Sequence, residues 1–133
     1  MPVFDIDLTT AGGPPDGTYV ATVNKVDYEA KVGEKWNKDG IKVVSAEEAK
    51  AYPAEQRRLH ITLSIPGHGN VWHDLYFMES ALGFMKQFCQ AAGIPLKNPD
   101  FDSLVGKQVL VTLATKNDPP YGDRQNIISI KKV

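Results

Sequence analysis

Aromatic and basic side chains gather in three parts of this sequence, in a combination that could bind a single-stranded nucleic acid. Bases stack on aromatic rings for about 1–3 kcal/mol each, while Lys and Arg contact the phosphates. The candidates for stacking are Trp36, Trp72, Tyr76 and Tyr121, with His60 beside them, and the candidates for phosphate contacts are Lys31, Lys35, Lys38, Arg58, Lys116 and Arg124. Because every base has a flat face, such a surface predicts little sequence preference.

The same residues also have a purely structural interpretation. Trp72 and Tyr76 could pack beneath the edge of a sheet, and the lysines could form a solvated loop. The net charge is −1, with 15 Lys and Arg against 16 Asp and Glu, whereas proteins that bind duplex DNA through phosphates are usually far more basic. A binding function therefore requires a local positive groove, and the presence of an aromatic residue among basic ones in two separate loops favours it.

Metal binding and catalysis have weaker support in the sequence. His60, His68 and His73 lack the close pairing of zinc ligands, and Cys89 extends an apolar stripe, so no metal site is predicted. The nearest catalytic pairings are Cys89 or Ser64 with His60 or His73, and Asp74 with Glu79. None lies in a nucleophile elbow, an HExxH helix or a phosphate-binding loop. We therefore expect a protein without a cofactor that is not an enzyme.

The first half of the chain must position one of the aromatic and basic groups. Residues 1–16 form an N-terminal arm that ends in Gly and Pro, and residues 17–28 predict a long, bent strand. In the arm, Phe4, Ile6 and Leu8 alternate with two aspartates and could add an edge strand to this chain, the favoured option, or to a partner subunit. Residues 29–56 form a long loop, with a short strand at 41–44 and a short helix opened by the Ser45–Glu48 capping box.

The second half contains the clearest patterns. Apolar and polar residues alternate over 57–65, and a turn at 66–70 leads into 71–77, which predicts a hairpin. If Leu75 faces inward, then Trp72, Asp74 and Tyr76 share a face with His60. Residues 79–93 have helical spacing that ends at Gly93, and the apolar stripe is Leu82, Met85, Phe88, Cys89 and Ala92. Strands are expected at 106–115 and 125–133, joined by a long turn.

These elements predict one mainly β domain over residues 1–133. Five strands with one helix between the third and fourth are the layout of an OB-fold barrel, which binds oligonucleotides on its second and third strands and the flanking loops. No apolar run approaches the roughly 20 residues of a membrane helix, and no secretory signal is visible at the N-terminus. With one cysteine, the chain suits a reducing cytoplasm.

Several landmarks in the sequence resemble a family of phage and prophage OB-fold proteins that bind single-stranded DNA, long described as being of unknown function. The landmarks are residues 15–19 (PDGTY), 59–65 (LHITLSI), 71–77 (VWHDLYF), 91–94 (AAGI), 104–107 (LVGK) and 121–122 (YG). They extend over most of residues 15–131, and each is structural rather than catalytic. The chain departs from the family pattern in its helical insert and in lacking an acidic C-terminal tail.

The resemblance implies non-catalytic coating of single-stranded DNA in phage replication or recombination, by a homodimer or a higher homo-oligomer in the host cytoplasm. Phage replication or recombination proteins are the implied partners, although the missing acidic tail puts recruitment by that route in doubt. The principal alternative is a phage OB-like module that binds protein, as a structural or accessory factor.

Overall fold

The computed structural model describes residue 3 and residues 14–36, 39–117 and 122–133. The apolar residues of the N-terminal arm, Phe4, Ile6 and Leu8, lie outside the described residues, as do Lys38 and Tyr121. The edge strand expected of the arm is therefore not part of the described fold.

The described chain forms one antiparallel sheet of six strands, which are the five expected of the barrel and the short strand expected in the long loop. The strands are β1 (Gly17–Lys31), β2 (Ile41–Val44), β3 (Arg57–Ile65), β4 (Gly69–Tyr76), β5 (Gln108–Asn117) and β6 (Asp123–Lys131). They are ordered β4-β3-β1-β5-β6, and β2 pairs with the end of β1. The mainly β prediction is confirmed, and so is the short strand at 41–44. The predicted end of the first strand was wrong, because residues 29–31 continue β1 by pairing with β2.

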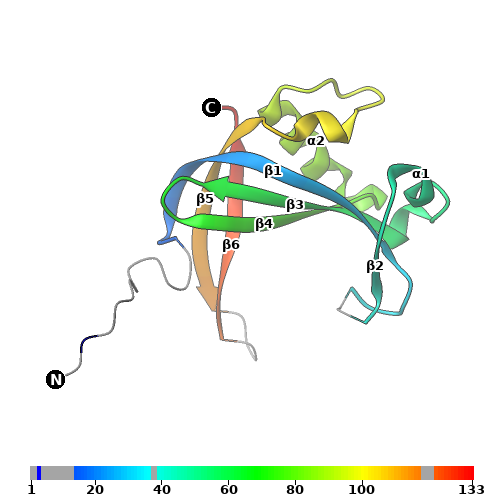
Figure 1. The fold of residues 1–133 in the computed structure, drawn as a ribbon, viewed down its shortest axis with the longest axis horizontal. Coiled ribbons are helices and arrows are strands. Elements are labelled where there is room, and N and C mark those ends of the chain that lie inside the picture. Colours follow the sequence, from blue (N-terminus) through cyan, green and yellow to red (C-terminus); the bar gives the residue numbers. More distant parts are fainter. Residues whose placement is uncertain (1–2, 4–13, 37–38, 118–121) are drawn as a thin grey trace.

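The first strand is the bent centre of the sheet. Residues Gly17 to Thr22 pair with β5, whereas Thr22 to Ala30 pair with β3, and the register shifts between Val23 and Lys25. A bulge of this kind bends a strand and increases its twist. In Figure 1, β1 consequently arches over the molecule, with β3 and β4 along it and β5 and β6 running across.

Two helices and three short 3-10 turns complete the described fold. They are α1 (Ala46–Ala49), α2 (Leu82–Ala92), η1 (Ala54–Gln56), η2 (Glu79–Ala81) and η3 (Phe101–Leu104). Ser45 caps α1 by accepting a hydrogen bond from the Glu48 amide, as its capping box predicts. Gly93 ends α2 with a φ of 79°, the left-handed conformation that glycine adopts most easily.

The main core lies between the curled sheet and α2. Phe88 is fully buried there, together with Leu59, Ile61 and Leu63 of β3. Four of the five residues of the predicted helical stripe are buried, but Leu82 is 44% exposed because it is the first residue of α2 and lies at the rim of the core. No helix in the described ranges has the length and apolarity needed to cross a bilayer.

The curled sheet is compatible with the barrel-like fold expected from the sequence, but it does not close within the described residues. Strands β4 and β6 are the two ends of the strand order, and neither pairs with the other within the described residues. The side chains between them include the polar Asn70, Gln125 and Asn126. Such groups keep their water, so little hydrophobic free energy draws the two edges together.

Candidate nucleic-acid interface

The outer face of β3 and β4 presents the aromatic and polar residues expected there. The register places Arg58 opposite Tyr76, His60 opposite Asp74, and Thr62 opposite Trp72. Leu75 on the other face is 1% exposed, whereas Trp72 is 58% exposed. The predicted division between the two faces of the hairpin is therefore confirmed.

An ion-pair network occupies the centre of this face. Arg58 Nε donates to Glu29 Oε1 at 2.8 Å, and its Nη1 lies 3.5 Å from Asp74 Oδ2. Nη1 also donates to the Tyr76 hydroxyl at 3.1 Å. Burial lowers the pKa of Arg58, but its bonds to Glu29, Asp74 and Tyr76 outweigh this and leave the pKa raised. Arg58 is only 8% exposed, which leaves it little access to the phosphate predicted for it.

The tryptophan of the first loop packs onto this network. The Trp36 ring centroid lies 4.6 Å from Arg58 Cζ and 5.5 Å from the Tyr76 ring, which it meets edge to face. Lys31 Nζ lies 5.9 Å from the same indole, and Lys35 of this loop is exposed. The structure thus brings together residues that are up to 45 positions apart in the chain, and Arg58 holds Trp36 and Tyr76 in place.

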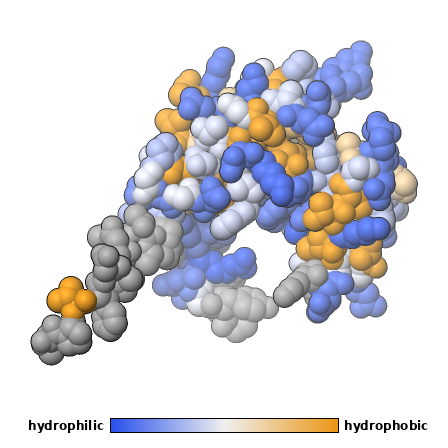
Figure 2. All heavy atoms as spheres, viewed as in Figure 1, coloured by the Kyte–Doolittle hydropathy of each residue, from blue (hydrophilic) through white to orange (hydrophobic). Residues whose placement is uncertain are grey.

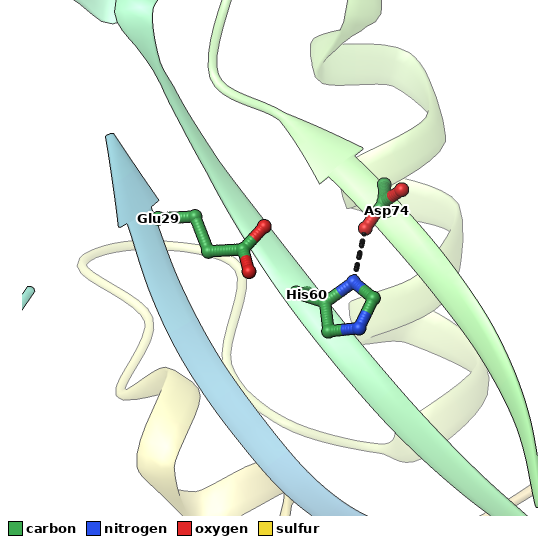
Figure 3. A group of neighbouring side chains, drawn as sticks. All are labelled: Glu29, His60 and Asp74. Atoms are coloured by element: carbon green, nitrogen blue, oxygen red, sulfur yellow. Dashed lines mark hydrogen bonds and ion pairs between the residues drawn. The ribbon is translucent and has the colours of Figure 1, made fainter. Parts of the chain in front are cut away.

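Three possible metal ligands, which the sequence did not reveal, lie within this network. Glu29, His60 and Asp74 come from β1, β3 and β4, and their ligand atoms lie within 4.8 Å of one another (Figure 3). The His60 Nδ1 and Asp74 Oδ1 atoms are hydrogen-bonded at 2.6 Å. Because the Arg58 guanidinium already contacts both carboxylates, a metal ion would have to displace a paired cation. The cluster is therefore better described as an ion-pair network.

A cleft of about 750 Å³ separates β4 from β6. Its apolar lining comes from Val71, Leu113 and Ile127, while Trp72 and Arg124 are exposed along it. This volume is within the usual range of ligand sites. The sequence analysis did not predict this cleft, and the polar residues at both strand edges are the one sequence signal that could have indicated it.

The remaining residues considered in the sequence analysis lie partly on the surface and partly in the core. Lys116 is the cross-strand partner of Arg124 near the end of the β5–β6 hairpin, and both are exposed. His73 faces inward, where it stacks on Phe88 at a centroid distance of 6.0 Å, and burial lowers its pKa. The aromatic cluster and the cleft meet at Asp74 of β4, which lines the cleft and also pairs with Arg58 and His60.

The centre of the outer face carries no surplus of positive charge. Glu29 and Asp74 share one cation, Arg58, and Lys25 pairs with Asp27 at 3.6 Å. A phosphate would therefore gain little at the centre of this face. The paired basic residues Lys116 and Arg124 and the loop lysines are better placed to contact a nucleic-acid backbone.

Comparisons with known proteins add no assignment. No protein-family model matches the chain, and no curated protein shows significant sequence similarity to it.

Proposed function

We propose that this protein binds single-stranded DNA and does not catalyse a reaction on it. The observation that carries this proposal is the exposure of Trp72, which is 58% accessible at the edge of a polar cleft of about 750 Å³. More than half of this indole is left in water on β4. A stacked base would bury its apolar face, at a gain of about 1–3 kcal/mol.

The proposal includes an OB-type fold. Its support is the pairing of β1 with both β3 and β5, together with the position of α2 between β4 and β5. OB-folds are partly open barrels that bind oligonucleotides on the second and third strands. In this chain those strands would be β3 and β4, which carry Trp72 and Tyr76.

The residues divide into those that contact DNA and those that position them. Trp72 stacks a base, and Arg124 and Lys116 contact the backbone beside it. Trp36 offers a second stacking surface, with Lys31 and Lys35 nearby. Arg58 and His60 position the aromatic residues through their bonds to Glu29, Asp74 and Tyr76. Lys38 and Tyr121 remain sequence-based candidates in the two flanking loops.

The biological setting follows from the resemblance to phage proteins. We propose a role in phage DNA replication or recombination in the host cytoplasm, with a homodimer or higher homo-oligomer as the binding unit and phage replication or recombination proteins as its partners.

Fluorescence anisotropy of a labelled oligo-dT tests the proposal. The protein is titrated at low and at moderate salt, with unlabelled duplex as the competitor. We expect binding that weakens as salt rises, because counterions return to the phosphates, and that duplex does not abolish. The absence of binding at low salt would contradict the proposal.

A protein-binding module is the second candidate. An apolar groove of about 840 Å³ follows α2, with Leu82 and Leu96 of its lining 44% and 46% exposed. Apolar residues also gather over the lobe of β2 and α1 in Figure 2. Val32 and Val43 are 55% and 60% exposed. Exposed apolar patches of this kind often mark protein interfaces, so failure to bind DNA would favour this function.

A further inference from the structure

We propose that the apolar groove beside α2 (the α2 groove) binds an acidic amphipathic helix of a partner protein. The groove has a volume of about 840 Å³, and none of its described lining residues also lines the cleft between β4 and β6. Binding at the α2 groove therefore goes beyond the proposed function, and it can be measured without DNA.

One wall of the α2 groove is a face of α2 itself. Leu82, Met85, Lys86 and Cys89 line the groove, and their spacing of i, i+3, i+4 and i+7 places them on one face of a helix. Met85 and Cys89 are 7% and 2% exposed and form the floor, whereas Leu82 is 44% exposed at the rim. This face extends over about 10 Å along the helix axis, which is the length of about two helical turns.

The other wall is the segment that follows α2. Leu96, Lys97, Pro99 and Phe101 line the groove from this segment. Phe101 packs edge to face against Phe77, which also lines the groove, at a centroid distance of 5.7 Å. Leu96 is 46% exposed. The groove thus has a packed aromatic pair in its lining and an apolar side chain at the rim of each wall.

The openness of the groove favours one face of a helix as its occupant. A small ligand buries most of its surface in its pocket, but an occupant between Leu82 and Leu96 would leave one side in water. None of the described lining residues belongs to a strand, so an extended peptide would find no strand edge to pair with. An amphipathic helix needs only an apolar groove for its apolar face and water for its polar face.

The charges of the lining select an acidic helix. Lys86 and Lys97 are both exposed, and the described lining includes no Asp or Glu. In the described part of the chain, neither lysine forms an ion pair with a carboxylate. Asp100 and Asp102, which follow Lys97 in the chain, line a neighbouring hollow with Tyr28.

A docked helix can use both lysines, because one comes from each wall. Carboxylates on the two flanks of its apolar face would lie beside Lys86 and Lys97. Each exposed ion pair changes affinity only a few-fold, so the lysines determine which partner binds, whereas the apolar contact supplies most of the affinity.

Selection from a display library of random peptides tests the proposal without a known partner. Peptides of about 15 residues, long enough for a short helix, are selected on the full chain and counter-selected on Leu82→Asn/Leu96→Asn. Both leucines are almost half exposed, so this variant should remain folded, which thermal unfolding checks. We expect the selected peptides to have apolar residues at helical spacing, flanked by Asp or Glu.

Three results of the selection would overturn the proposal. One is the absence of any peptide that distinguishes the unchanged chain from the Asn variant. Another is apolar residues that alternate as in a strand, or flanks without acidic residues. The third is a dimer in sedimentation that the Asn variant dissociates, because the groove would then bind a second copy of this chain.

Anisotropy of the most enriched peptide, labelled with fluorescein, tests the role of the two lysines. We expect Lys86→Glu/Lys97→Glu to weaken binding at least about fivefold, since two attractive pairs become repulsive. The matched control is Lys42→Glu/Lys107→Glu, which changes the net charge equally at two exposed lysines outside the groove lining, and it should change the Kd less than about twofold. Equal weakening by both variants would mean that net charge alone attracts the peptide, and would overturn the proposal. Because no DNA is present, this outcome is independent of the proposed function.

Discussion

The ion pair between Arg58 and Glu29 gives the sharpest test of the structure itself. Arg58→Met removes the guanidinium but keeps an unbranched side chain of similar length. The change leaves the Glu29 carboxylate, which is 11% exposed, without its partner at 2.8 Å. It also removes the cation beneath Trp36 and the donor to Tyr76.

The expected magnitude follows from the burial of the pair. Removing one partner of a buried ion pair costs about 3–5 kcal/mol, because an uncompensated charge remains. Both side chains retain about a tenth of their exposure, and Asp74 keeps its bond to His60. We therefore expect Arg58→Met to lower the free energy of unfolding by about 3 kcal/mol, the lower end of that range.

Urea unfolding followed by circular dichroism measures this loss. The double variant Glu29→Leu/Arg58→Met leaves no unpaired charge at this pair, so it should recover at least about half of it. Lys50→Met is the matched control, because Lys50 and Glu47 form a pair whose side chains are 69% and 84% exposed, and it should change stability by less than about 0.5 kcal/mol. A loss below about 1 kcal/mol for Arg58→Met, or no recovery in the double variant, would refute the reasoning.

Three further results are expected. Burial lowers the pKa of His73, so the unfolded chain binds a proton that the folded chain excludes. The free energy of unfolding should therefore fall as pH decreases below about 6.5. In urea titrations, His73→Phe should weaken this pH dependence. Burial and the nearby Asp102 raise the pKa of Tyr28 to about 12. The free energy of unfolding should therefore fall as pH rises from about 10 to about 12. An equally steep fall in Tyr28→Phe would contradict a contribution from Tyr28. Lys116→Gln should make the slope of log Kobs against log salt shallower by about 0.7 if Lys116 contacts one phosphate of a single strand, whereas an unchanged slope would exclude that contact.

The local patterns in the sequence predicted most of the elements. Alternation over residues 57–65 placed Leu59 and Ile61 in the core and Arg58 and His60 on the opposite face, because strand side chains alternate with a period of two. Gly93 marked the end of α2, since the left-handed conformation there favours glycine. These predictions depend only on neighbours along the chain.

Features that depend on pairing between distant residues could not be predicted. The pair between Glu29 and Arg58 requires the β1–β3 register, which no local pattern gives. The extension of β1 through Lys31 depends on pairing with β2, because the short segment EAK at residues 29–31 has no strand pattern of its own. The gap between β4 and β6 depends on how far the whole sheet curls, which the predicted barrel layout could not specify.

The sequence identified residues of the candidate site more successfully than it identified the role of each residue. Trp72 faces outward, as expected, but Arg58 is occupied by ion pairs because Glu29 and Asp74 lie on the adjacent strands. Its basic side chain alone could not reveal those partners. Trp36 and Tyr76 were expected as separate stacking positions, and the structure joins them through Arg58.

The central claim is tested most directly by comparing oligo-dT binding to the unchanged protein and to Trp72→Ala by fluorescence anisotropy. We expect the substitution to weaken binding by about 1–3 kcal/mol, or roughly 5- to 150-fold, while leaving the unfolding transition nearly unchanged. The control is Phe84→Ala, which removes another exposed aromatic residue outside the cleft and should leave binding unchanged. Equal affinity of Trp72→Ala and the unchanged protein would contradict the proposed site.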